Sequence, residues 1–165
     1  MMTPITINDF LLSPNFSFAE MTDSSSHQEL VQENRTLALQ DPILDNLKDL
    51  CLLVLQPIRK ELNKPIQVNS GFRCDKLNSL IGGAKTSQHR LGQAADLDLN
   101  SEEGNKELFD LIIKMMREKR IAVGQVIQEH SGSSAWVHVS SKTSTISGQV
   151  LTYDGKNYHL VETIK

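Results

Sequence analysis

Residues 87–99 have the sequence SQHRLGQAADLDL, in which a short polar segment leads into an alternating one. Gly92 suits a turn, because glycine adopts backbone conformations that are closed to other residues. The alternation that follows is typical of a half-buried strand, with Asp96 and Asp98 on one face and leucines on the core face. The loop before this strand can fold His89 back over its start, so we expect the imidazole and the Asp96 carboxylate to converge.

A second segment, residues 135–140, has the sequence AWVHVS and the same alternation. Its valines are expected to face the core, and His138 the opposite side. His89, Asp96 and His138 would then supply three ligands, the number that a catalytic zinc ion takes from a protein while one position stays open for water. Each histidine alone has a simpler interpretation, since an isolated His is more often a hydrogen-bonded or solvated side chain than a ligand.

Together the two segments resemble the signature of the zinc D-Ala-D-Ala carboxypeptidase family, also called peptidase family M15. That family includes small L,D- and D,D-peptidases that bacteriophages and bacteria use on peptidoglycan. The resemblance extends upstream through NSGFR at residues 69–73 and LNSLIGGA at residues 77–84, and it covers about residues 40–140. The matching pattern is Ser87-x-His89-x-x-Gly92-x-Ala94-x-Asp96, followed by Trp136-x-His138.

The resemblance implies an α+β fold with helices packed on a small, mainly antiparallel sheet, similar to the fold that this family shares with the hedgehog signalling domain. The length of 165 residues is most simply one domain, residues 1–165. A long buried helix is expected to begin at Asp41, as its N-cap, and to kink or break at Pro57. A terminal hairpin over about residues 148–161 is expected to cover one edge of the sheet.

The same resemblance implies roles for the site residues. Zinc would be held by His89, Asp96 and His138. Arg73 would bind the substrate, because a planar guanidinium can hold a carboxylate through two parallel hydrogen bonds, as a C-terminal D-amino acid requires. A surface salt bridge is the alternative for this arginine. Ser87 would hydrogen-bond the substrate or orient the neighbouring ligand loop.

The catalytic base departs from the clearest family pattern. Many members carry a carboxylate three residues before the last metal-binding histidine, where this chain has Ala135. A related subgroup carries a glutamate on the preceding strand, and Glu129 resembles it. Glu129 is therefore the expected base, which would take a proton from water and pass it to the leaving amine. His130 is a second candidate, and if neither reaches the metal site the domain would bind without cleaving.

The expected function is hydrolysis of a peptide bond in peptidoglycan stem peptides by a monomeric zinc peptidase. The D-Ala-D-Ala bond and the L-Ala-D-Glu bond are the two candidates, so the enzyme would be a carboxypeptidase or an endopeptidase. One alternative is a zinc-stabilised but inactive module that binds the cell wall or has a structural role, which the missing carboxylate at Ala135 motivates. Another is a peptidase for a different peptide that contains D-amino acids.

Composition excludes several other classes of function. The net charge is −3 and no block of basic residues occurs, so a nucleic-acid partner is not expected. The first ten residues, Met1–Phe10, have no basic region and no long apolar run, and no segment is long enough to span a membrane. We therefore expect a protein that is made in the cytoplasm without a signal peptide. It would reach the cell wall after release by a phage lysis system or as part of a virion.

The two cysteines, Cys51 and Cys74, do not suggest a disulfide framework. Cys51 lies in an apolar helical pattern and is expected in the core. Cys74 follows Arg73 and is expected at the edge of the proposed site. Both are interpreted as structural thiols, with a nucleophilic Cys74 as the alternative.

Overall fold

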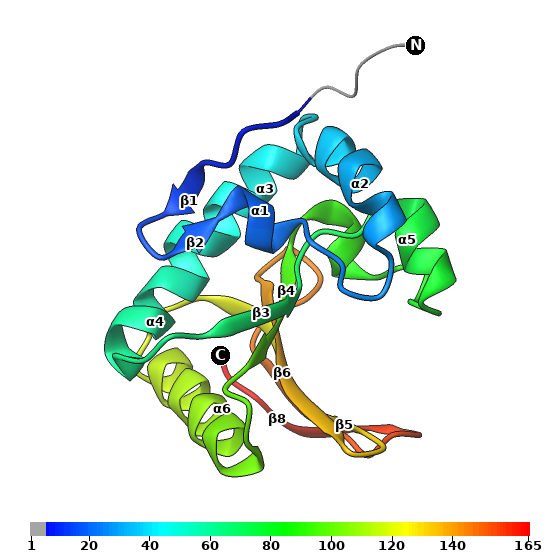
Figure 1. The fold of residues 1–165 in the computed structure, drawn as a ribbon. Coiled ribbons are helices and arrows are strands. Elements are labelled where there is room, and N and C mark those ends of the chain that lie inside the picture. Colours follow the sequence, from blue (N-terminus) through cyan, green and yellow to red (C-terminus); the bar gives the residue numbers. More distant parts are fainter. Residues whose placement is uncertain (1–5) are drawn as a thin grey trace.

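The computed structural model describes residues 6–165 and has the α+β fold that the sequence predicts (Figure 1). The interpretation of Met1–Phe10 falls partly on residues 1–5, which lie outside the described part of the chain. The helices are α1 (Phe18–Met21), α2 (Val31–Ala38), α3 (Ile43–Leu50), α4 (Gln56–Leu62), α5 (Asp75–Leu80) and α6 (Glu102–Arg117), with the 3₁₀ turns η1 (Gln28–Leu30) and η3 (Gln88–Leu91) and the π-helical segment η2 (Cys51–Leu55). The strands are β1 (Leu11–Ser13), β2 (Phe16–Ser17), β3 (Gln67–Ser70), β4 (Ala94–Asp98), β5 (Val123–Ser131), β6 (Ser134–Ser141), β7 (Gln149–Tyr153) and β8 (Tyr158–Thr163).

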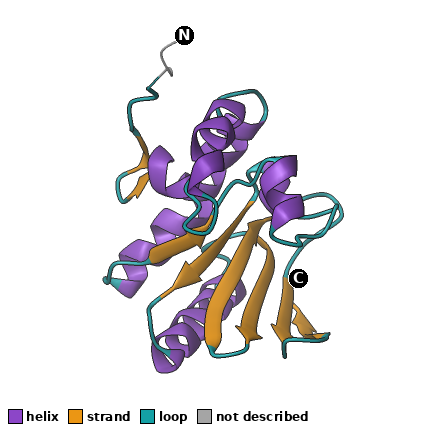
Figure 2. Ribbon diagram, turned by 45° about the vertical axis from the view of Figure 1, so that its right-hand side comes forward, coloured by secondary structure: helices purple, strands orange, loops and turns teal. Residues whose placement is uncertain are grey.

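Six strands form one sheet in the order β3-β4-β6-β5-β7-β8 (Figure 2). Every neighbouring pair is antiparallel except β5 and β7, which run parallel. The expected, mainly antiparallel sheet is therefore confirmed. The terminal hairpin of β7 and β8 extends this sheet beyond β5, while β1 and β2 pair separately near the N-terminus.

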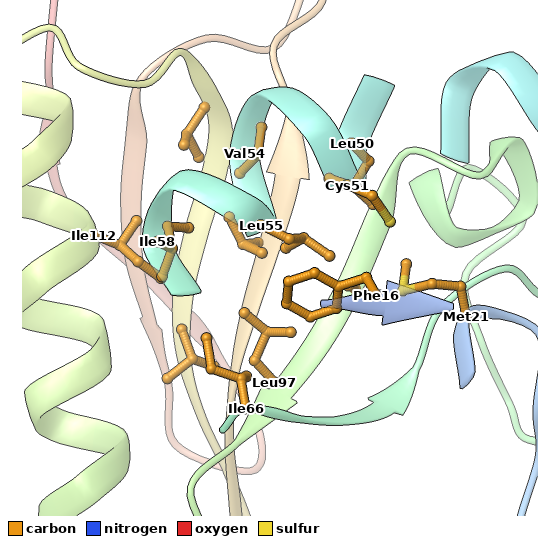
Figure 3. Packing of buried hydrophobic residues seen from close by; sticks show 14 of the residues in the cluster. Phe16, Met21, Leu50, Cys51, Val54, Leu55, Ile58, Ile66, Leu97 and Ile112 are labelled. Atoms are coloured by element: carbon orange, nitrogen blue, oxygen red, sulfur yellow. The ribbon is translucent and has the colours of Figure 1, made fainter. Parts of the chain in front are cut away.

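The core lies between one face of the sheet and two long helical elements. The α3–η2–α4 helix and α6 cover this face, and α6 contacts α4, β5 and β6 (Figures 1 and 2). Figure 3 shows Leu55 and Ile58 from the first element, Ile112 from α6 and Leu97 from β4 packed together, all fully buried. Removing one such side chain from water contributes about 2 kcal/mol, so this layer fixes the position of β4 under the site.

The long helix differs from the prediction at its start. It begins at Ile43, and Pro42 rather than Asp41 occupies the N-cap position. The backbone N–H groups of Ile43 and Leu44 donate to the carbonyl of Gln40, so a backbone turn, and not the Asp41 side chain, receives the first donors.

The break expected at Pro57 takes the form of the π-helical segment η2. The N–H of Gln56 donates to the carbonyl of Cys51, five residues back instead of four. Pro57 has no N–H to continue the ladder and lies in the first turn of α4, a position that tolerates proline. The helix therefore continues through the proline with one local change of spacing.

Candidate active site

Sheet register places the first two predicted ligands together. Asp96 of β4 and His138 of β6 are directly opposite partners, and Oδ1 of Asp96 lies 3.0 Å from Nδ1 of His138. The flanking residues Leu97 and Val137 are fully buried on the other face. A slip of one residue would turn the two ligands to opposite faces, so the packed core sets this half of the site.

The third predicted ligand comes from η3. Ser87 is the N-cap of this turn, and its hydroxyl accepts a hydrogen bond from the N–H of His89 at 3.3 Å. Nδ1 of His89 lies 2.7 Å from the carbonyl oxygen of Gly71 and must donate to it, which leaves the lone pair on Nε2. Nε2 lies 3.3 Å from Oδ1 of Asp96. The ring of His89 is thus oriented towards the other two ligands.

Gly71 can hold His89 in this way because helix α1 packs against it. A Cβ atom at position 71 would collide with the carbonyl oxygen of Met21, the last residue of α1. The same carbonyl accepts a hydrogen bond from the N–H of Phe72 at 2.8 Å. The backbone that orients His89 is therefore fixed by a helix far away in the sequence.

The chemistry of these three side chains suits a divalent metal ion. Their ligand atoms all lie within 4.8 Å of one another. Burial lowers the pKa of His89, so its Nε2 presents a lone pair to a carboxylate oxygen that is also an acceptor, and a cation between them would satisfy both. Burial alone would raise the pKa of Asp96, but His89 and His138 overcome that effect and hold it below its ordinary value, which keeps the carboxylate ionised. Two imidazoles and one carboxylate are a ligand set typical of zinc.

Glu129 lies on β5 beside this group. It pairs with Trp136 of β6, two residues along from the pair of Ile127 and His138, so Glu129 and His138 face the same side of the sheet. The side chain is buried, and burial together with the charge of Asp96 raises the pKa of Glu129 to about 7, while His138 and Arg73 oppose the rise. A carboxyl group with this pKa can both accept and release a proton near neutral pH.

Arg73 lies in the loop that follows β3. Its backbone N–H donates to the carbonyl of His89 at 3.1 Å, which fixes the two segments to each other. Burial lowers the pKa of Arg73 below its ordinary value, and the negative charges of Asp96 and Glu129 only partly oppose this shift. Nε of Arg73 is buried without a hydrogen-bond partner among residues 6–165. A half-buried guanidinium whose Nε donor is unused is suited to receive the carboxylate of a ligand.

The loop of Arg73 is supported by a residue that sequence reasoning missed. Asn34 of α2 is fully buried, and its Nδ2 donates to the carbonyls of Thr22 and Phe72 at 2.9 and 3.0 Å. Its Oδ1 accepts the N–H of Cys74 at 2.8 Å. No helix was predicted over residues 31–38, so no signal in the sequence marked Asn34, although a buried asparagine inside a helix is unusual because it competes for backbone hydrogen bonds.

The predicted site residues meet in one cleft of about 580 Å³. His130 does not enter it: this side chain lines a separate polar cleft of about 570 Å³, because alternate residues of β5 face opposite sides of the sheet. Cys74 does not line the cleft either, and it is buried at the N-cap of α5, whereas Cys51 lies in the core as expected. The residues that line the cleft include Arg73, Ser87, His89, Asp96, Ile127, Glu129, Trp136, His138, Leu151, Tyr153 and Tyr158.

Comparison with known proteins identifies the family of the chain. Residues 14–140 match the family model described as Peptidase M15. The chain belongs to the M15 peptidase family. A relative of this chain is the zinc D-Ala-D-Ala carboxypeptidase of Streptomyces albus G, which is 35% identical to it over 89 residues. The alignment covers 53% of this chain and 32% of that protein, so the chain matches about a third of its relative's length.

These matches confirm the family inferred from the sequence, and the zinc in the relative's name agrees with the ligand set. Strands β7 and β8 of this M15 family member lie beyond the segment that the family model matches. Within residues 6–165, no helix is both long enough and apolar enough to cross a membrane.

Proposed function

We propose that this chain is a zinc-dependent peptidase that hydrolyses a peptide bond of peptidoglycan stem peptides. The observation that carries the proposal is the meeting of three metal-ligand side chains, a buried glutamate and a half-buried arginine in one cleft. His89, Asp96 and His138 would hold the zinc ion. Bound there, the ion supplies polarisation of the scissile carbonyl and lowers the pKa of water at the open position.

Glu129 is the proposed general base. Its pKa is about 7 in the metal-free protein, and a zinc ion at the ligands would favour the ionised carboxylate, which can accept a proton from the attacking water. The protonated carboxyl can then donate that proton to the nitrogen of the leaving amine. The sheet holds Glu129 on the same face as His138, which keeps this proton transfer beside the metal ligands.

Arg73 is the proposed anchor for the substrate carboxylate. Its unpaired Nε lies in the same cleft as Glu129 and the ligands. The C-terminal D-Ala of a D-Ala-D-Ala peptide carries the carboxylate that such an anchor would bind through two parallel hydrogen bonds. The relative's name favours the D-Ala-D-Ala bond.

The experiment that tests this function is mass spectrometry of purified stem peptides incubated with zinc-loaded protein. A chelated sample, His138→Ala and Glu129→Gln are run in parallel. Metal-dependent release of D-Ala would establish a carboxypeptidase, and a cut between L-Ala and D-Glu an endopeptidase. A folded, zinc-bound protein that leaves every stem peptide intact would refute the proposal and favour a binding module.

A further inference from the structure

A row of aromatic side chains crosses the sheet on both sides of Glu129. In the strand register Glu129 pairs with Trp136 of β6 and with Tyr153 of β7, and Tyr153 pairs in turn with Tyr158 of β8. The rings of Tyr153 and Tyr158 have their centroids 4.5 Å apart. All four side chains line the cleft, so the proposed base lies between an indole and a pair of phenols.

The next row of side chains across the sheet changes from polar to apolar in the direction from β4 to β7. It runs from Asp96 and His138 through Ile127 of β5 to Leu151 of β7. All of these also line the cleft. The floor is therefore polar at the metal ligands and apolar towards the terminal hairpin, where the two tyrosines border it.

Tyr158 is unusually exposed for an aromatic residue at the border of a cleft. Its exposed fraction is 58%, although it lines the same cleft as the buried Glu129 and the half-buried Arg73. Burial of the remaining part and the charge of Glu129 raise the pKa of Tyr158, so the phenol stays neutral next to the carboxylate. A neutral aromatic surface that continues from the cleft is suited to cover an apolar group of a bound peptide.

We propose that the β7–β8 hairpin forms the specificity wall of the cleft, with Tyr158, supported by the ring of Tyr153, contacting an aliphatic side chain of the peptide substrate next to the scissile bond. This inference rests on the proposed function, since it assigns the peptide that the cleft would hold. It adds residues outside the segment shared with the family model, residues 14–140. The hairpin would thus give this chain a preference that the metal ligands do not determine.

Trp136 provides a direct measure of binding. It is the one tryptophan of the sequence and lines the same cleft, so its fluorescence should change when a peptide occupies the site. The parent protein for the titration is zinc-loaded Glu129→Gln, in which turnover is expected to be too slow to consume the peptide during the measurement. Stem pentapeptide is titrated into the parent and into the parent carrying Tyr158→Ala, Tyr158→Phe or Val161→Ala. Val161 is exposed on the same strand and does not line the cleft, which makes it the matched control.

Tyr158→Ala is expected to raise the Kd about fivefold to tenfold, because one aromatic contact is lost. Tyr158→Phe keeps the ring and should bind like the parent, as should Val161→Ala. Equal Kd values for Tyr158→Ala and the parent would refute the proposed role of the Tyr158 ring. A rise in Kd for Tyr158→Phe as large as that for Tyr158→Ala would refute it too, because the hydroxyl and not the ring would then make the contact. If the parent binds no stem peptide and the wild type cleaves none, the proposed function itself fails.

Discussion

Glu129 and His130 are neighbours in the chain but face opposite sides of the sheet, Glu129 in the cleft of the metal ligands and His130 in a separate polar cleft. The alternation of β5 turns the two side chains apart, although Trp136 lines both clefts. Of the two residues considered as the base, only Glu129 therefore lies on the same face as His138.

Glu129→Gln is expected to lower kcat by about 10²- to 10⁴-fold, the usual contribution of a general base, while the protein still binds zinc. His130→Ala is the matched control and should keep near wild-type activity. The measurements are peptide cleavage and the zinc content of each purified protein. A large loss of activity in His130→Ala with full activity in Glu129→Gln would reverse the assignment.

Asp96→Ala should weaken zinc binding by on the order of a hundredfold or more, because it removes a charged ligand at the centre of the group. Asp98→Ala is the control, since Asp98 shares the face of Asp96 but hydrogen-bonds Asn69 and Asn105 instead. Competition with a chromogenic chelator gives both affinities. Equal zinc affinity in the two variants would exclude Asp96 as a ligand.

The raised pKa of Glu129 predicts a pH-dependent stability of the metal-free protein. A carboxyl group whose pKa is higher in the folded chain stabilises folding when protonated, and this contribution is lost as pH rises from about 4.5 through about 7. Glu129→Gln cannot ionise, so above pH 8 it should exceed the wild type in free energy of unfolding by about 3 kcal/mol, relative to their difference at pH 4. Urea denaturation at both pH values, with chelator present, measures this change. A constant difference across the range would contradict the pKa assigned to Glu129.

Arg73→Lys should raise KM for a stem peptide by on the order of tenfold, because a lysine cannot make the two parallel hydrogen bonds of a guanidinium. The control is a substrate in which the carboxylate next to the scissile bond is converted to an amide. Wild-type enzyme should lose affinity for this amide, and the variant should discriminate less between the two substrates. The anchor role fails if the wild type cleaves acid and amide equally well.

Asn34→Ala should lower the free energy of unfolding by about 2–3 kcal/mol, since it leaves one buried N–H and two buried carbonyls without their partner. Thr36→Ala, on the exposed side of the same helix, should change it by less than about 0.5 kcal/mol. Chemical denaturation compares the two. If Asn34→Ala is as stable as Thr36→Ala, the loop of Arg73 is held by other contacts.

The convergence of Asp96 and His138 could be predicted because local alternation decides which face of the sheet each side chain occupies. Asp96 and His138 each lie in a strand whose apolar positions must be buried, so the face of each side chain follows from the pattern. Asp98 shows the limit of that reasoning. It shares the predicted face, yet its carboxylate accepts hydrogen bonds from the side chains of Asn69 and Asn105. A pattern gives the face of a residue and does not give its partner.

The rest of the cleft depends on long-range pairing that a local pattern cannot show. The terminal hairpin was predicted, but its parallel pairing with β5, which brings Tyr153 beside Glu129, depends on how the chain crosses back to the sheet. Asn34 likewise bonds to groups 12, 38 and 40 residues away. Such contacts are set by tertiary packing, so they cannot be predicted from the local sequence pattern.

The contact between Gly71 and Met21 has a consequence for how such a sequence can change over time. As long as α1 is present, position 71 must remain glycine, because any side chain there would displace the carbonyl that orients His89. A lineage that lost α1 would free this position to accept larger residues and would need another means of orienting the imidazole. We therefore expect the two features to be inherited together or lost together, although fifty residues separate them in the chain.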